Sequence, residues 1–186
     1  MREEYPFPDQ ESSFRILRRD PVFAKIEEGD VQRVFDDAWQ CGTDAAIGFI
    51  RKHCSLTVLD MVDVFHSYGF TIQYFNYDYV VGHQRYFCEY TAKKKRISVY
   101  KKSVERWAEN NGFSYERGLN LILSHEFYHY LEATELGYTS RRYLVPMIML
   151  GKLRLGKTGV PALSEIAANA FANYCYNHFL CLRGEE

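Results

Sequence analysis

Apolar residues recur at helical spacing in the first third of the chain. Between Asp30, which can cap a helix, and Trp39, apolar side chains fall three and four positions apart, and they do so again from Ala46 to Ile50. Gly42 separates the two stretches. The pattern therefore predicts two short helices that meet near this glycine.

A third amphipathic stretch ends at a glycine. Its apolar positions run from Leu59 to Phe65, and either Ser55 or Thr57 is placed to cap its start. Gly69 follows at a position where helices often end in the left-handed conformation. We therefore expect a helix over this segment.

The period of the pattern then changes from that of a helix to that of a strand. Three segments rich in Tyr, Phe, Ile, Val and Thr span residues 70–77, 85–91 and 96–103, and polar linkers separate them. These segments predict a small, largely antiparallel sheet.

Two long helices are expected in the second half of the chain. Ser114 can cap the first, which has an uninterrupted helical pattern over residues 115–136. The last helix begins at Pro161, a residue that suits the first turn of a helix, and extends to residues 183–184. Residues 138–160, between the two helices, have the composition of a loop-rich insertion.

This order of elements, helices followed by a sheet and then two long helices, is typical of an α+β fold. The small sheet is expected to pack against the helix over residues 115–136 and against the C-terminal helix. We expect one compact unit, with residues 1–54 forming an N-terminal tail and a helical segment that pack on a core domain of residues 55–186.

Composition narrows the classes of function. The chain has 186 residues, 47% of them hydrophobic, with 23 Lys and Arg against 24 Asp and Glu. It can therefore bury a core, and it has no overall positive charge to hold nucleic acid or an anionic membrane. No apolar run approaches the roughly 20 residues that cross a bilayer, and the N-terminus lacks the pattern of a secretory signal. We expect a cytoplasmic protein with no membrane or nucleic-acid partner; the sequence does not indicate an oligomeric state.

The predicted helix over residues 115–136 contains His125-Glu126-Phe127-Tyr128-His129, an H-E-x-x-H motif. Residues four apart share one face of a helix, so the two imidazoles can bind one ion while Glu126 lies beside it. This is the geometry of a zinc hydrolase in which the glutamate acts as general base. Because the motif also arises by chance and catalytic zinc normally has three protein ligands, a third ligand is needed.

The last helix supplies a candidate for the third ligand. Glu165, Ala168, Asn169 and Ala172 share one of its faces. The alanines would let this helix approach the motif helix closely, so that Glu165 can give one oxygen to the metal. Asn169 can hydrogen-bond the far nitrogen of a ligating histidine. Without the H-E-x-x-H motif, the alanine face would indicate only close packing.

Together these features resemble the ImmA/IrrE-type metallopeptidases, which are minimal gluzincins. The resemblance covers residues 56–180 and rests on the H-E-x-x-H helix and on a Glu-x-x-Ala-Asn-x-Phe-Ala signature that begins at Glu165. It implies a zincin-like fold in which His125, His129 and Glu165 hold Zn²⁺. It also implies an intracellular protease that cleaves one protein, such as a helix-turn-helix transcriptional repressor. This chain has Ala167 where the family often has a glutamate.

Peptide hydrolysis also needs a platform for the substrate and a group that stabilises the oxyanion. We expect the strand over residues 96–103 to be an edge to which an extended peptide adds, with Ser98 and Tyr100 on one face. Three side chains are possible partners of the oxyanion, and the sequence does not decide among them: Tyr138, Tyr143 and His178.

Two other classes of function stay open. Zinc can be a structural staple of a non-catalytic interaction or regulatory module, although a closed structural site has no use for Glu126. Residues 151–158 match the phosphate loop G-x-x-x-x-G-K-[ST] of nucleotide hydrolases. Pro146 interrupts the segment before this match, and Pro161 separates it from the following helix, so we favour a basic insertion.

Overall fold

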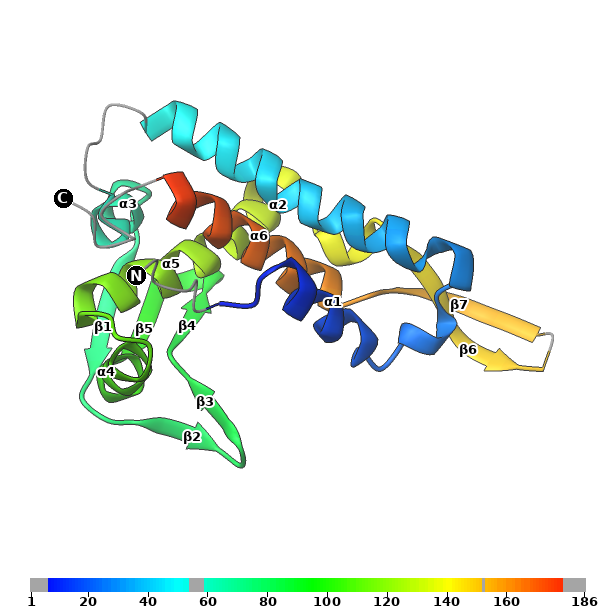
Figure 1. Ribbon diagram of the computed structural model, residues 1–186, viewed down its shortest axis with the longest axis horizontal. Coiled ribbons are helices and arrows are strands. Elements are labelled where there is room, and N and C mark those ends of the chain that lie inside the picture. Colours follow the sequence, from blue (N-terminus) through cyan, green and yellow to red (C-terminus); the bar gives the residue numbers. More distant parts are fainter. Residues whose placement is uncertain (1–6, 54–58, 152, 179–186) are drawn as a thin grey trace.

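The computed structural model describes residues 7–53, 59–151 and 153–178. It has an elongated shape, with the helices at its centre and two β-ribbons projecting from it (Figure 1). The α-helices of the described residues are α1 (Gln10–Arg18), α2 (Val31–His53), α3 (Met61–Ser67), α4 (Lys101–Asn110), α5 (Tyr115–Leu131) and α6 (Ala162–His178). The strands are β1 (Thr71–Phe75), β2 (Tyr79–Val81), β3 (Gln84–Tyr86), β4 (Cys88–Thr91), β5 (Arg96–Tyr100), β6 (Leu144–Leu150) and β7 (Leu153–Gly159). The prediction of an α+β fold is confirmed.

The main sheet is small and mixed. Its strand order is β1-β5-β4, with β5 antiparallel to β4 and parallel to β1. The ribbon of β2 and β3, followed by β4, lies between β1 and β5 in the sequence, and this crossover allows the parallel pairing. The prediction of a strand over residues 96–103 was correct only as far as Tyr100, because α4 begins directly after it.

Helix α2 is continuous, and the prediction of two helices that meet at Gly42 was wrong. The glycine is needed for packing. A Cβ atom built on Gly42 would lie 1.9 Å from the backbone oxygen of Ala167 and 2.9 Å from Cβ of Ala170. Because only glycine fits at this contact, α2 can lie directly against α6.

The helix over residues 115–136 is confirmed, although its last turn differs from the rest. Ser114 accepts a hydrogen bond from the backbone N–H of Arg117 and caps the start of α5. A π-helical turn, Glu132–Leu136, continues the helix to its end. Helix α3 is capped by Asp60, whereas the two caps that we expected, Ser55 and Thr57, lie outside the described residues.

Two clusters of buried apolar side chains hold the fold together, and α6 contributes to both. One surrounds α5 and includes Phe127 and Phe171. The other joins α1, α2 and the start of α6 and includes Phe35 and Ile166. Helices α5 and α6 are buried over nearly their whole surface, as expected of helices that are apolar on all sides.

The N-terminal helix and the C-terminal helix differ from what the sequence predicted. An N-terminal tail was expected at the start of residues 1–54, yet α1 is a helix that Asp9 caps, and it packs on α6. Helix α6 is described as far as His178, so its predicted end at residues 183–184 lies outside the described residues. Within the described chain, no helix has the length and apolar character needed to span a membrane.

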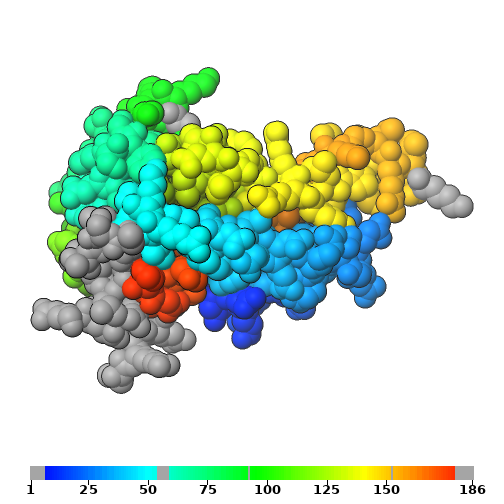
Figure 2. Space-filling model, turned by 90° about the horizontal axis from the view of Figure 1, so that it is seen from above, coloured from blue at the N-terminus to red at the C-terminus, as the bar shows by residue number. Residues whose placement is uncertain are grey.

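The expected loop-rich insertion is instead a hairpin. Strands β6 and β7 pair along their length, and Gly151, with a φ of +58°, takes part in the tight connection between them. Pro146 is tolerated because each strand of a two-stranded ribbon is an edge strand. The hairpin projects from one end of the molecule in two perpendicular views (Figures 1 and 2).

Candidate metal centre

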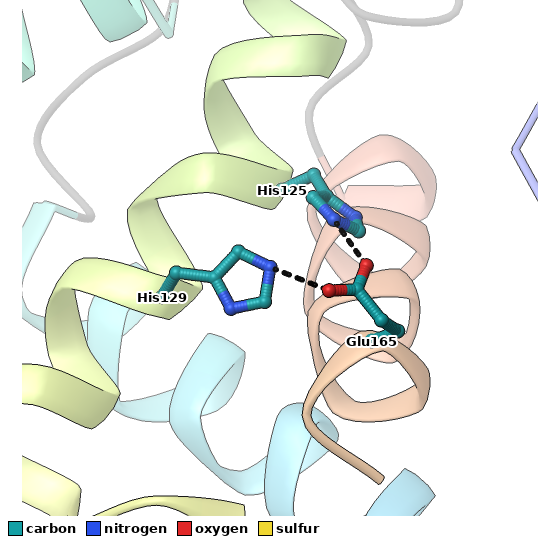
Figure 3. A group of neighbouring side chains, drawn as sticks. All are labelled: His125, His129 and Glu165. Atoms are coloured by element: carbon teal, nitrogen blue, oxygen red, sulfur yellow. Dashed lines mark ion pairs between the residues drawn. The ribbon is translucent and has the colours of Figure 1, made fainter. Parts of the chain in front are cut away.

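Helices α5 and α6 bring three of the predicted residues together. His125 and His129 lie on one face of α5, and Glu165 lies in the first turn of α6 (Figure 3). Nε2 of His125 is 3.4 Å from Oε2 of Glu165, and Nε2 of His129 is 3.6 Å from Oε1. Ligand atoms of the three residues all lie within 4.8 Å of one another. In a tetrahedral zinc site with bonds of about 2.1 Å, ligand atoms lie about 3.4 Å apart, so this spacing fits one ion.

Small side chains accompany Glu165 on α6. Ala168 and Ala172 are fully buried, and Ala168 belongs to the apolar cluster that surrounds α5. Gly42 brings α2 against the same helix. The close packing therefore fixes the position of α6, and with it the position of the Glu165 carboxylate opposite the two histidines.

The carboxylate of Glu165 is well suited to be a ligand. Its hydrogen bond with His125, together with the charges of His125 and His129, lowers its pKa to about 2 in spite of the opposing effect of burial. The side chain is 53% exposed. Glu165 is therefore ionised at neutral pH, and the group of three residues can be reached from solvent.

Glu132 contacts the far side of His129 and was not predicted from the sequence. Its side chain is only 2% exposed, and its Oε2 lies 3.3 Å from Nδ1 of His129. Its Oε1 accepts hydrogen bonds from the backbone N–H of Thr139 (2.7 Å) and from the hydroxyl of Ser164 (2.9 Å). Burial alone would raise its pKa, but these contacts outweigh burial and lower it.

This arrangement orients His129. Burial would lower the pKa of the imidazole, but the hydrogen bond to Glu132 and the charges of Glu165 and Glu126 raise it. With Nδ1 held by Glu132, Nε2 is directed toward Glu165. A carboxylate behind a ligating histidine is a common feature of zinc sites. An acidic residue three positions after the second histidine was the sequence signal that could have identified Glu132.

The predicted role of Asn169 was wrong. Its side-chain amide donates to the hydroxyl of Ser13 in α1 (3.4 Å). The far nitrogen of His129 is held by Glu132, and the far nitrogen of His125 has no hydrogen-bond partner among the described residues. The ring of Phe7 instead stacks on His125, with centroids 5.7 Å apart. Asn169 therefore joins α6 to α1. The sequence did not predict helix α1, so this contact was not foreseen.

Glu126 lies beside the three residues and is not one of the group that could hold a metal ion. Burial raises the pKa of its carboxyl group, while the charges of His125 and His129 oppose this effect. The thiol of Cys88, in β4, hydrogen-bonds to Glu126, and burial together with the Glu126 charge raises the pKa of the thiol. Glu126 thus has the position and the surroundings of a proton acceptor next to the centre.

The prediction that Ser98 and Tyr100 lie on a substrate-binding edge was wrong. Strand β5 is central in its sheet, with β1 and β4 on its two sides, and both residues are buried. The hydroxyl of Tyr100 donates to Glu89. The edge of the sheet next to Glu126 is β4, because its residue Cys88 contacts Glu126.

The three possible oxyanion partners are placed differently. The hydroxyl of Tyr143 donates to Asp30 (3.0 Å), so it is engaged at the start of α2. His178 is 13 positions after Glu165 on the same helix, which places it about 20 Å away along the axis. Tyr138 is half exposed, and its ring lies under the guanidinium of Arg141. Of the three, only Tyr138 therefore remains a candidate for stabilising the oxyanion.

The phosphate-loop match lies in the hairpin. Of its residues, Gly151 lies at the turn and residues 153–158 lie in β7, which pairs with β6. A phosphate loop needs a helix whose N-terminal amides hold the phosphates, and here the strand continues to Gly159 before α6 begins. The geometry therefore gives no support to nucleotide hydrolysis.

Comparisons of the chain with models of protein families, with curated proteins and with solved structures found no match. Inferences about function therefore rest on the residues and the geometry described above.

Proposed function

We propose that this protein is a zinc-dependent endopeptidase that cuts a narrow set of protein substrates. One observation carries the proposal: ligand atoms of His125, His129 and Glu165 lie within 4.8 Å of one another, next to the partly buried Glu126. The order of these residues on two packed helices is the one that the resemblance to ImmA/IrrE-type metallopeptidases implies.

The donor set fits zinc. Two imidazole nitrogens and one carboxylate oxygen are typical zinc ligands, whereas magnesium and calcium favour sites made of oxygen atoms. Three protein ligands leave a fourth position for a water molecule or a substrate, as in catalytic sites. Bound there, zinc would supply Lewis acidity for a substrate carbonyl and for an attacking water.

The residues of the chain would do the rest of the chemistry. Glu126 takes a proton from the attacking water and passes it to the leaving amine. Burial raises its pKa above that of a free carboxyl group, which makes the carboxylate a better proton acceptor. Glu132 holds His129 in the orientation that presents Nε2 to the centre.

Of the two edge strands of the sheet, β4 is the one that contacts Glu126, and we infer that it binds an extended substrate. It has a described neighbour on one side only, β5, and Cys88 connects it to Glu126. A peptide that pairs with this edge would be held by backbone hydrogen bonds close to the centre. A substrate held along one short strand suits limited cleavage of one regulator, for example a transcriptional repressor, better than general digestion.

The test uses a proteome-derived peptide library, because the substrate need not be known in advance. Mass spectrometry would identify new peptide ends after incubation with the zinc-loaded protein. Glu126→Gln keeps the shape of the side chain and removes the base, so we expect it to retain zinc and to lose cleavage by a factor of at least about 100. Glu135→Gln, an exposed glutamate in the π-helical turn, is the matched control and should cleave like the wild type.

Two results would contradict the proposal. Equal cleavage by wild type and Glu126→Gln would place the base elsewhere. Zinc binding without cleavage of any peptide, and without cleavage of repressors encoded next to its gene, would instead support the alternative of a non-catalytic zinc-containing interaction module.

A further inference from the structure

One face of the β6–β7 hairpin is a row of exposed aliphatic side chains. In its register Ile148 pairs with Leu155, and Leu150 pairs with Leu153. Paired residues and residues two apart lie on the same face of a ribbon, so these four side chains share one face. Leu150 is 72% exposed, and the other three are about half exposed. The apolar face of this hairpin is therefore open to solvent within the described chain.

The opposite face is also apolar in part. Met147 and Met149 are 56% and 43% exposed, and Arg154, the partner of Met149, lies beside them. Near the base of the hairpin the chain turns inward, because Val145 is buried in the cluster that joins α1, α2 and α6. Apart from Leu144, which is 48% exposed at the base, the exposed apolar residues of the hairpin lie in the part that projects from the body (Figures 1 and 2).

Positive charge accompanies this apolar surface. Residues 139–160 contain five basic residues and no acidic one. The nearest described acidic partner is Glu27, which pairs with Arg154 at 3.2 Å, and both side chains are exposed. Exposed pairs of this kind are weak, so Glu27 offsets the charge of the hairpin only slightly. Lys25 adds a further positive charge through its hydrogen bond to the backbone oxygen of Met147.

We propose that the β6–β7 hairpin docks on the surface of an anionic phospholipid bilayer. A second copy that paired with an edge of the ribbon, or that covered the aliphatic face, would leave Met147 and Met149 in water. A bilayer interface surrounds a thin ribbon and accepts apolar side chains on both faces. Arg154 pairs with Met149 near the tip, and Lys157 pairs with Pro146 on the body side of the exposed aliphatic residues. Their charged ends can therefore meet anionic headgroups while the apolar side chains insert. The near-zero charge of the whole chain does not reveal this local arrangement.

The inference is independent of the proposed peptidase activity and is tested by vesicle flotation. The full chain would be mixed with phosphatidylcholine vesicles that contain or lack phosphatidylglycerol. We expect flotation with the anionic vesicles only, and less of it at high salt. The double variant Leu150→Ser/Leu153→Ser should abolish flotation, and Arg154→Gln/Lys157→Gln should reduce the partition coefficient by about tenfold or more.

A matched control comes from the other ribbon. Val81, in β2, is 52% exposed, and Val81→Ser should float like the wild type. Circular dichroism would show that all variants are folded. The proposal is overturned if the wild type does not float with anionic vesicles, or if Leu150→Ser/Leu153→Ser floats equally well. It is also overturned if the wild type forms dimers that the same variant disrupts while no vesicle binding occurs, because the occupant would then be a second copy.

Discussion

Two regions depart in opposite ways from the usual placement of apolar residues in the core and polar residues at the surface. One is the packed interface between α5 and α6, here called the seam, and the other is the β6–β7 hairpin. At the seam, the partly buried His129 and the buried carboxylate of Glu132 lie beside an apolar core. In the hairpin, Ile148 and Leu150 lie in water. Burying a polar group and exposing a large apolar side chain are both unfavourable for a folded monomer. The two proposals explain both departures in the same way: an ion would bind at the seam, and an apolar environment would cover the hairpin.

The largest effect on stability is expected at Glu132. Glu132→Ala removes the acceptor of the Thr139 N–H and Ser164 hydroxyl groups and leaves His129 without its partner, so we expect a loss of about 3 kcal/mol in the free energy of unfolding. Urea denaturation with a chelator present would measure it without a contribution from metal. Exposed Glu135→Ala should change stability by less than about 0.5 kcal/mol. Similar values for the two variants would show that the buried network is not important for the seam.

The next effect tests the packing that positions α6. Gly42→Ala would place a methyl group against the backbone of Ala167, so we expect a loss of about 2 kcal/mol. Gly48 lies on the same helix with open space at its Cβ position, and Gly48→Ala should stabilise the protein by about 0.5–1 kcal/mol. Thermal unfolding of the two variants should show changes in stability of opposite sign. The same sign for both would contradict the close contact between α2 and α6.

A smaller effect is expected at Tyr128, which extends the polar network of the seam. Its hydroxyl lies 2.6 Å from that of Thr139, and the Thr139 backbone holds Glu132. Tyr128→Phe removes this buried hydrogen bond and should cost about 1 kcal/mol. Exposed Tyr74 supplies the control, since Tyr74→Phe should be neutral in the same urea titration. If Tyr128→Phe left the free energy of unfolding unchanged, the hydroxyl of Thr139 would not be part of this network.

The smallest effect is expected in the hairpin. Leu150→Ser should change the free energy of unfolding by less than about 0.5 kcal/mol, because the side chain is 72% exposed. Val145→Ala, in the buried base of the same strand, should cost about 2 kcal/mol. Urea denaturation of the two variants would compare them. A large loss at Leu150 would mean that the tip packs on the chain itself, and the contrast with the seam would fail.

The sequence was most informative where local pattern and tertiary structure agree. The helix over residues 115–136 could be predicted because Ser114 caps it and its apolar pattern is uninterrupted. The sequence also singled out His125, His129 and Glu165, since fixed spacing on a helix determines which residues share a face.

Other features depend on contacts that local pattern does not contain. Gly42 looks like a helix breaker in the sequence, but it lies in the middle of α2 because α6 needs the space. Ser98 and Tyr100 lie in a central strand, and strand order is set by long-range pairing. The β6–β7 hairpin was missed because β6 is apolar at every position, so the alternation that indicates a strand is absent there, and β7 contains two glycines.

The metal content of the purified protein tests the central claim most directly. The protein would be purified without chelators, incubated with zinc and dialysed, and its zinc content would be measured by elemental mass spectrometry. The account predicts one zinc ion per chain in the wild type and in Glu126→Gln, and almost none in His129→Ala and Glu165→Ala, with all four proteins folded by circular dichroism. Zinc contents that are equal in the wild type and in His129→Ala, or a wild type that binds no zinc, would contradict it.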